Sequence, residues 1–104
     1  MAEKEIGGNI TLIDFDLDGQ EMIIVKKMIG NCARKIKNFT EYRDLKVEMK
    51  IHQKNKGHKK YEFKASLIFD VRRADAEVEG LNPFVALNEL LSKILGEVEH
   101  KVKK

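Results

Sequence analysis

The sequence is short of the residues that disulfide bonding, membrane insertion and base stacking require. Its 104 residues contain one cysteine, one proline and no tryptophan. The single Cys32 cannot form an internal disulfide, as is typical of a reducing compartment. No apolar run is long enough to cross a membrane, and residues 1–5 lack the apolar core of a signal peptide. We therefore expect a cytoplasmic protein with no membrane partner.

Motifs for catalysis are also missing. No Gly-rich phosphate loop appears in the sequence. No nucleophile and general base stand at a spacing that is typical of a catalytic site. Cys32 falls on an apolar helix face, where a small core residue is expected rather than a nucleophile. We expect a protein that is not an enzyme and that has no cofactor and no small-molecule substrate.

Metal binding has one candidate, which fails on its spacing. Residues 14–19, DFDLDG, copy the first half of a calcium-binding EF-hand loop. Position twelve of such a loop needs a bidentate carboxylate, and Val25 stands there. Of the histidines, His52 and His58 can approach each other, but a zinc site needs three or four ligands. No metal site is predicted.

The charge of the chain is concentrated in its middle. The net charge is +3, but residues 19–60 hold twelve Lys or Arg and four acids, whereas residues 1–18 hold one Lys and five acids. Such asymmetry favours an anionic partner such as nucleic acid, although a lysine-rich solvated surface is the simpler alternative. The five phenylalanines fall on faces that we expect to be buried, so bases have no stacking platform. An interface directed at the phosphate backbone remains.

Two alternating runs predict a hairpin. Residues 45–52 and 61–69 each alternate apolar and polar side chains, which is typical of half-buried strands. The connection, residues 53–60, carries four lysines and a histidine but no acid. Like charges on one loop repel each other, so this loop is suited to a polyanionic partner.

A strand and a helix are expected before the hairpin. Residues 1–8 are expected to be flexible, and residues 10–17 predict a strand with Thr11, Ile13, Phe15 and Leu17 on one face. Asp18 and Glu21 form a capping box at the start of a helix that runs to about Phe39. The apolar face of that helix comprises Met22, Val25, Met28, Ile29, Cys32, Ala33, Ile36 and Phe39. The opposite half carries five cations and no acid.

A last strand and helix complete the order of elements. Residues 70–73 predict a turn, residues 74–79 a strand, and Asn82 with Pro83 the start of a second amphipathic helix. The order β-α-β-β-β-α predicts an α+β fold in a single domain over residues 1–104. The simplest packing is a four-stranded sheet with both helices on one face.

Residues 76–88, AEVEGLNPFVALN, resemble the ribosome hibernation-promoting factor family, also called ribosome-associated translation inhibitors. There a strand that ends in A-x-x-E-G is followed by D-x-Y-x-A-I-D and an amphipathic helix that ends in lysines. The residues that take the corresponding positions here are Asn82, Phe84, Ala86, Leu87 and Asn88. Lys35, Ile36 and Phe39 are similar to the family's K-L-x-x-h-F helix ending, and the resemblance spans residues 9–104.

This resemblance implies that the protein binds the rRNA of the small ribosomal subunit, between head and body where tRNA and mRNA would lie. It would thereby modulate or inhibit translation. By position, the implied contacts on the first helix and the hairpin loop are Lys26, Lys27, Arg34, Lys35, Lys37, Lys54, Lys56, Lys59 and Lys60, to which we add His58 from the same loop. Long family members carry a C-terminal dimerisation domain, which these residues lack, so a monomer is expected.

Two other functions stay open. A double-stranded-RNA-binding domain would carry a lysine cluster where the last helix begins, and residues 82–86 hold no cation. A protein–protein adaptor would use the acidic strand face of Asp75, Glu77 and Glu79. Binding by such an adaptor would not depend steeply on salt.

Overall fold

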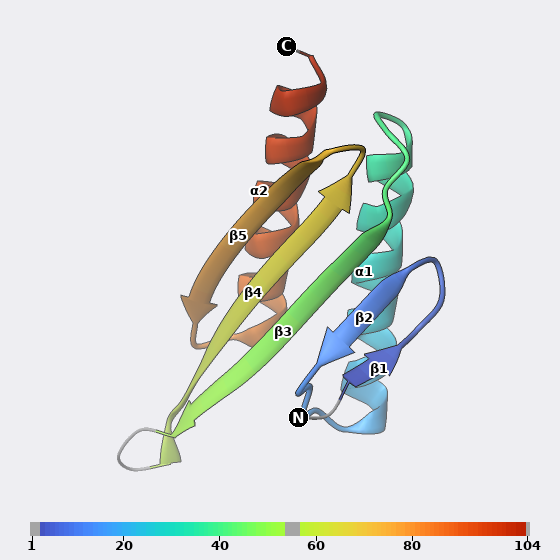
Figure 1. Cartoon of the computed structure of the whole chain (residues 1–104). Helices are drawn as coiled ribbons and strands as arrows, with labels where there is room; N and C mark the ends of the chain where they lie inside the picture. Colours follow the sequence, from blue (N-terminus) through green and yellow to red (C-terminus); the bar gives the residue numbers. More distant parts are fainter. Residues whose placement is uncertain (1–2, 54–56, 104) are drawn as a thin grey trace.

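The protein is an α+β fold in which two helices cover one face of a five-stranded sheet (Figure 1). The structure, a computed structural model, describes residues 3–53 and 57–103. In chain order the elements are β1 (Glu3–Glu5), β2 (Ile10–Ile13), α1 (Gly19–Lys37), β3 (Asp44–Gln53), β4 (Lys59–Phe69), β5 (Arg72–Gly80) and α2 (Pro83–Val102).

The order of the strands in the sheet follows their order in the sequence, β1-β2-β3-β4-β5. Only β2 and β3 pair in parallel, and α1 is the crossover helix between them. The other pairs are antiparallel, and β3 and β4 form the long hairpin that the alternating runs predicted. The predicted α+β class and the placement of both helices on one face are confirmed.

The predicted number of strands is wrong, because β1 adds a fifth strand at one edge. Glu3 of β1 lies opposite Ile13 of β2 in an antiparallel pair. Gly7 and Gly8, with φ of 93° and 61°, reverse the chain between the two strands. Such backbone angles suit glycine, which has no Cβ to clash. Strand β1 lies within residues 1–8, which the sequence predicts to be flexible.

The predicted faces of the strand over residues 10–17, which corresponds to β2, are also wrong. Ile10 and Leu12 are buried, whereas Thr11 and Ile13 lie on the face of the sheet that the helices leave uncovered. The strand ends at Ile13 because Asp14 takes a φ of 57°, which breaks the alternation. Beyond this break the chain returns to the core.

The core lies between the sheet and the two helices. The buried residues of α1 are Val25, Ile29, Cys32, Ala33 and Ile36, and those of α2 are Ala86, Leu87, Leu90, Leu91, Ile94 and Val98. Phe15, which follows the break after β2, packs with its ring centroid 6.0 Å from that of Phe63. The predicted apolar faces of both helices are confirmed, so the polar half of α1 faces solvent.

Both predicted helix starts are present. Asp18 Oδ1 accepts a hydrogen bond from the Glu21 amide at 2.8 Å, and Glu21 Oε1 accepts one from the Asp18 amide at 3.2 Å. Asn82 Oδ1 accepts from the amides of Phe84 and Val85 at 2.9 and 3.2 Å. These side chains replace hydrogen-bond acceptors that the first turn of a helix lacks. They fix where each helix begins, and the buried apolar face of α1 sets which of its residues face outward.

Candidate nucleic-acid interface

The outer face of α1 carries a group of cations that are free of acidic partners. Lys27, Arg34, Lys35 and Lys37 are exposed, and Lys26 is half-buried. Among residues 3–53 and 57–103, none of these five side chains forms an ion pair. Arg34 donates a hydrogen bond to Asn31 Oδ1, one turn back on the same face. A phosphate can therefore approach these cations without displacing a carboxylate.

Most cations elsewhere in the described residues are paired, although Lys4, Arg43, Lys50 and Lys59 form no ion pair there. Lys60 lies 2.8 Å from Glu79, and Lys103 lies 2.8 Å from Glu99. Longer ion pairs of 3.9 Å involve Lys46, Lys64, Arg72, Lys93 and Lys101. Such exposed pairs contribute little to stability, but they neutralise the local charge. Five unpaired cations therefore gather on α1, whereas the cations of the sheet and of α2 are mostly paired.

The loop after α1 adds a cation that the sequence analysis missed. Tyr42 is 7% exposed and donates a hydrogen bond to the Gly8 carbonyl, and Lys37 Nζ lies 5.8 Å from its ring centroid. The next amide, of Arg43, donates to the Ile68 carbonyl at 2.7 Å. These contacts hold the loop on the sheet and present the exposed Arg43 near the end of α1. The sequence shows Tyr42 directly before Arg43, but it does not show that Tyr42 is buried and so holds this loop in place.

The predicted hairpin residues lie elsewhere. His58 and Lys59 are exposed, Lys60 is half-buried in its ion pair, and Lys54 and Lys56 lie outside the described residues. The hairpin projects from the end of the sheet where α1 begins, whereas α1 ends at the other end, beside the turn between β4 and β5 (Figure 1). The structure therefore does not bring the hairpin residues together with the cations in the last turn of α1.

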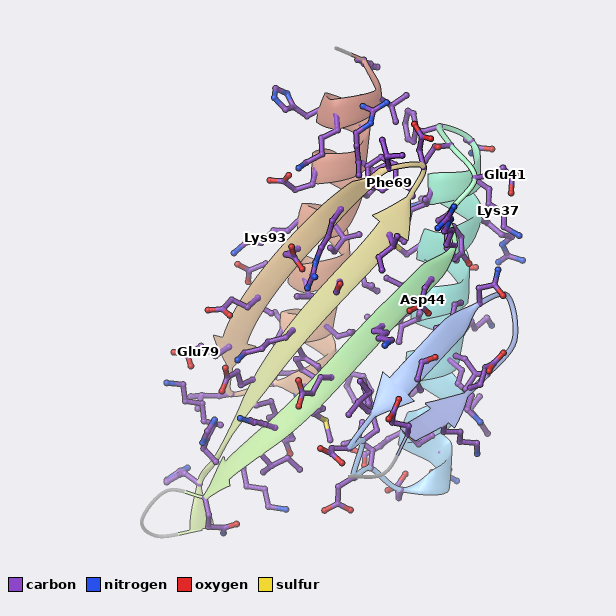
Figure 2. The ribbon with its side chains drawn as sticks, viewed as in Figure 1. Lys37, Glu41, Asp44, Phe69, Glu79 and Lys93 are labelled. Carbon is purple, nitrogen blue, oxygen red and sulfur yellow. The ribbon has the colours of Figure 1, made fainter. Side chains whose placement is uncertain are left out.

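The uncovered face of the sheet differs from the α1 face in its charge. A hollow of 670 Å³ on this face is lined by charged residues of both signs, which are Lys46, Glu48, Lys64, Arg73, Asp75 and Glu77. Ile13 and Ile68 contribute apolar surface to it. Figure 2 shows side chains of this face directed toward the viewer. Glu79 lies beside β5 at one border of the sheet, and Lys37 and Glu41 lie at the opposite border, near the end of α1. A surface of mixed sign gives a polyanion no net attraction.

The cysteine and one of the candidate histidines have structural roles. Cys32 is buried with its Sγ 3.7 Å from the Leu91 carbonyl, and burial raises the pKa of its thiol to about 11. Its predicted role as a small core residue is confirmed. His52 Nε2 lies 2.8 Å from Glu62 Oε1, and this hydrogen bond lowers the pKa of Glu62.

The described residues offer neither a metal site nor a membrane-spanning helix. They contain no group of three His, Cys, Asp or Glu side chains placed to hold a metal ion, and Asp18 of the EF-hand-like run is the helix cap. Neither helix, within that part of the chain, combines the length and the apolar character that spanning a bilayer needs.

Comparison with solved structures shows what this fold is similar to. The N-terminal domain of Protein Y from Thermus thermophilus matches with a TM-score of 0.59 over 88% of this chain and 92% of that chain. The two sequences are 12% identical over the match, so the likeness shows the fold alone. No protein-family model and no curated protein matches the sequence.

Proposed function

We propose that this protein is a ribosome-associated factor that binds rRNA of the small subunit with the outer face of α1 and modulates or inhibits translation. The observation that carries the proposal is the set of free cations on α1, extended by Arg43. Two further findings support it. Residues 76–88 resemble the motif of the ribosome hibernation-promoting factor family. The N-terminal domain of Protein Y from Thermus thermophilus has a similar fold.

The physical basis of binding is the release of counterions from RNA phosphates. Each phosphate that a lysine or arginine neutralises frees condensed cations, which favours binding at low salt. The α1 face supplies five such groups, namely Lys26, Lys27, Arg34, Lys35 and Lys37, and the loop after α1 supplies a sixth, Arg43. With no tryptophan in the chain, the interface follows the shape and phosphates of folded rRNA rather than stacked bases.

The hairpin supplies a second contact in this proposal. His58 and Lys59 project from the opposite end of the sheet to the loop that carries Arg43 (Figure 1). A small protein that holds RNA at both ends fits a cleft between two RNA bodies. The family resemblance implies such a place, between the head and body of the small subunit. Occupation of that channel would exclude tRNA and mRNA, which is the proposed route to inhibition.

A salt titration tests this function. Binding of fluorescently labelled protein to purified small ribosomal subunits should weaken steeply with salt, with a log–log slope of about −4 to −5 for six phosphate contacts. A flat dependence would refute binding through phosphates and favour an adaptor function.

Competition with RNA separates the ribosomal proposal from general duplex binding. An excess of plain double-stranded RNA should displace the protein poorly, because the proposed site is shaped by folded rRNA. Equal displacement by duplex RNA and by unlabelled small subunits would instead assign the protein to general double-stranded-RNA binding.

A further inference from the structure

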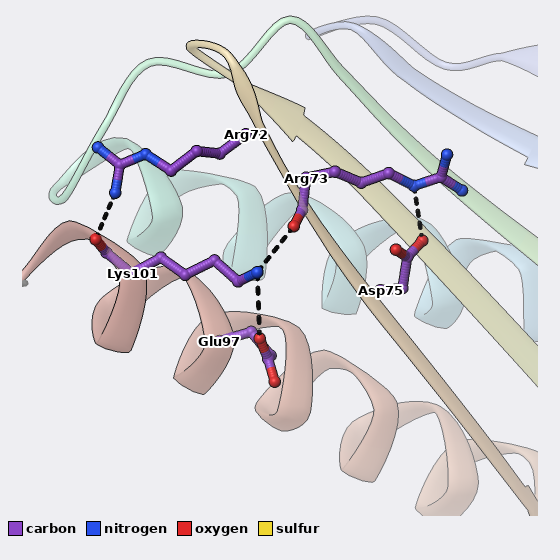
Figure 3. Close-up of polar contacts among 5 residues, drawn as sticks. All are labelled: Arg72, Arg73, Asp75, Glu97 and Lys101. Carbon is purple, nitrogen blue, oxygen red and sulfur yellow. Dashed lines mark hydrogen bonds and ion pairs between the residues drawn. The ribbon is translucent and has the colours of Figure 1, made fainter.

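Strand β5 forms an edge of the sheet, and no strand from residues 3–53 or 57–103 lies on its outer side. The direction of its backbone groups follows from two hydrogen bonds. The carbonyl of Ile68 in β4 accepts from the Arg43 amide, so Ile68 is turned toward β3. Arg73, which lies opposite Ile68 in β5, is therefore turned away from β4. On that outer side, Lys101 Nζ of α2 donates a hydrogen bond of 3.1 Å to the Arg73 carbonyl (Figure 3).

The remaining outward groups of the edge follow by alternation. Backbone groups point to the same side at every second residue of a strand, so Asp75, Glu77 and Glu79 also direct their amides and carbonyls outward. Their neighbours Ala74, Ala76 and Val78 pair with β4. The edge thus offers three residues that can accept another strand.

The side chains at these three positions are all carboxylates. Asp75 and Glu79 have 57% and 54% of their side chains exposed. Asp75 pairs with Arg73 at 2.9 Å, and Glu79 pairs with Lys60 at 2.8 Å. Glu77 forms no ion pair within the described residues. A second copy of β5 would place acids opposite acids, which destabilises a strand pair. The charge pattern therefore opposes pairing of this edge with itself.

A groove lies along the same edge, between β5 and α2. It has a volume of 400 Å³ and is lined by residues 75–77 of the strand and by Lys93, Gly96, Glu97 and His100 of the helix. Apart from its chain neighbours and the backbone of its own helix, no described atom lies within 4 Å of the place where a Cβ would stand on Gly96, so the groove is open there. Its lining carries three carboxylates and one ammonium group. Small side chains of an added strand fit over Gly96, and basic ones fit above the acids.

We propose that the outer edge of β5 binds an extended basic peptide by strand addition, with Lys or Arg at every second position. The backbone of the peptide pairs with Asp75, Glu77 and Glu79. One cation of the peptide lies opposite Glu77, which has no ion pair within the described residues, and the others exchange with Arg73 and Lys60 as partners of Asp75 and Glu79. Such exposed ion pairs contribute little to stability, so this exchange costs little. The surface lies along the border of the sheet opposite β1, whereas α1 lies behind the other half of the sheet (Figure 1). The α1 contact with RNA and the peptide can therefore form at the same time.

Peptides of matched charge test the backbone contact. The probe is the synthetic peptide acetyl-KVKVKVK-amide, in which each lysine directs its amide toward β5 when its side chain lies on the acidic face. Methylation of the lysine amides should weaken binding by at least about tenfold, because each methyl removes a donor. Methylation of the valine amides, which face away, should have little effect. Equal affinity of the two methylated peptides, measured by calorimetry, would overturn strand addition, as would failure of the unmodified peptide to bind.

Two protein variants test the edge itself. Glu77→Pro removes an amide that does not pair with β4, and proline is tolerated in this situation on edge strands. The variant should fold, keep its binding to small ribosomal subunits and lose the peptide. Glu77→Lys with Glu79→Lys keeps every amide and should also lose the peptide, through repulsion. Peptide binding by both variants would overturn the proposal. Concentration-dependent dimers of the wild type that Glu77→Pro abolishes would overturn it too, by assigning the edge to a second copy.

Discussion

Charge reversal on α1 tests the proposed interface most sharply. Lys27 and Arg34 are both exposed on its outer face and have no ion-pair partner within residues 3–53 and 57–103. Lys27→Glu with Arg34→Glu should remove two phosphate contacts, which flattens the salt slope by roughly 1.5 and weakens binding on the order of 20-fold near physiological salt. Repulsion between the new carboxylates and phosphates adds to this loss.

The fold should survive these substitutions. Exposed substitutions usually change the free energy of unfolding by no more than about 0.5 kcal/mol. Arg34 lies in the last turn of α1, where an acid opposes the helix dipole at a cost of about 0.3 to 1 kcal/mol. A thermal melt should therefore show a cooperative transition at a slightly lower temperature.

A matched control separates the α1 face from the overall charge. Lys64→Glu with Arg73→Glu makes the same change of net charge on the uncovered face of the sheet, where both cations are already paired. The assay is fluorescence anisotropy of labelled protein with purified small ribosomal subunits across a salt series. The control should bind nearly as the wild type does. Equal losses in the two variants would show that net charge alone matters, and unchanged binding by the α1 variant would refute this interface.

Three further predictions concern the fold. The hydrogen bond from His52 lowers the pKa of Glu62 below its ordinary value of 4.5. This bond therefore stabilises the fold fully when the pH is above 4.5, and the stabilisation is lost as the pH falls through the lowered pKa of Glu62. His52→Leu should raise that pKa toward 4.5 in a carbon-13 NMR titration, and an unchanged value would assign the shift to neighbouring lysines. The thiol of Cys32, with a pKa of about 11, should react with Ellman's reagent only after denaturant is added, and rapid labelling of the native protein would contradict its burial. Ile36→Ala, at a fully buried position, should lower the free energy of unfolding in urea by about 2 to 5 kcal/mol. The control Ile23→Ala, at a site that is 68% exposed, should lower it by less than about 0.5 kcal/mol, and equal effects of the two substitutions would refute the assignment of faces.

The helices were the most predictable part of the fold. Each has an apolar face with a helical period, and each begins at a side chain that caps it, Asp18 or Asn82. Period and cap together fix both the start of a helix and its rotation. The cations on the outer face of α1 could therefore be placed correctly from the sequence.

The first two strands were predicted only in part: the start of β2 was found, but β1, the end of β2 and its faces were not, for a local reason. β1 has three residues, too few for an alternating pattern to be visible. The positive φ of Asp14 ends β2 and reverses the expected faces, and such an angle at a non-glycine residue leaves no clear trace in the sequence. Short strands and single unusual backbone angles depend on the tertiary packing around them.

Two features of the surface needed the structure. Arg43 lies outside any periodic segment, and its position depends on the burial of Tyr42. The outward direction of the amides of β5 depends on the register of β4 with its two neighbours, which the sequence does not specify. The distinction between free and paired cations also requires the positions of the acids around them.

Co-sedimentation with separated ribosomal subunits tests the central claim most directly. The protein would be mixed with purified small subunits and, in parallel, with purified large subunits, and each mixture would be run on a sucrose gradient at low and at high salt. The account predicts that the protein migrates with small subunits at low salt, is released at high salt and stays at the top of the gradient with large subunits. Absence from the small-subunit fractions at low salt, or equal migration with both subunits, would contradict it.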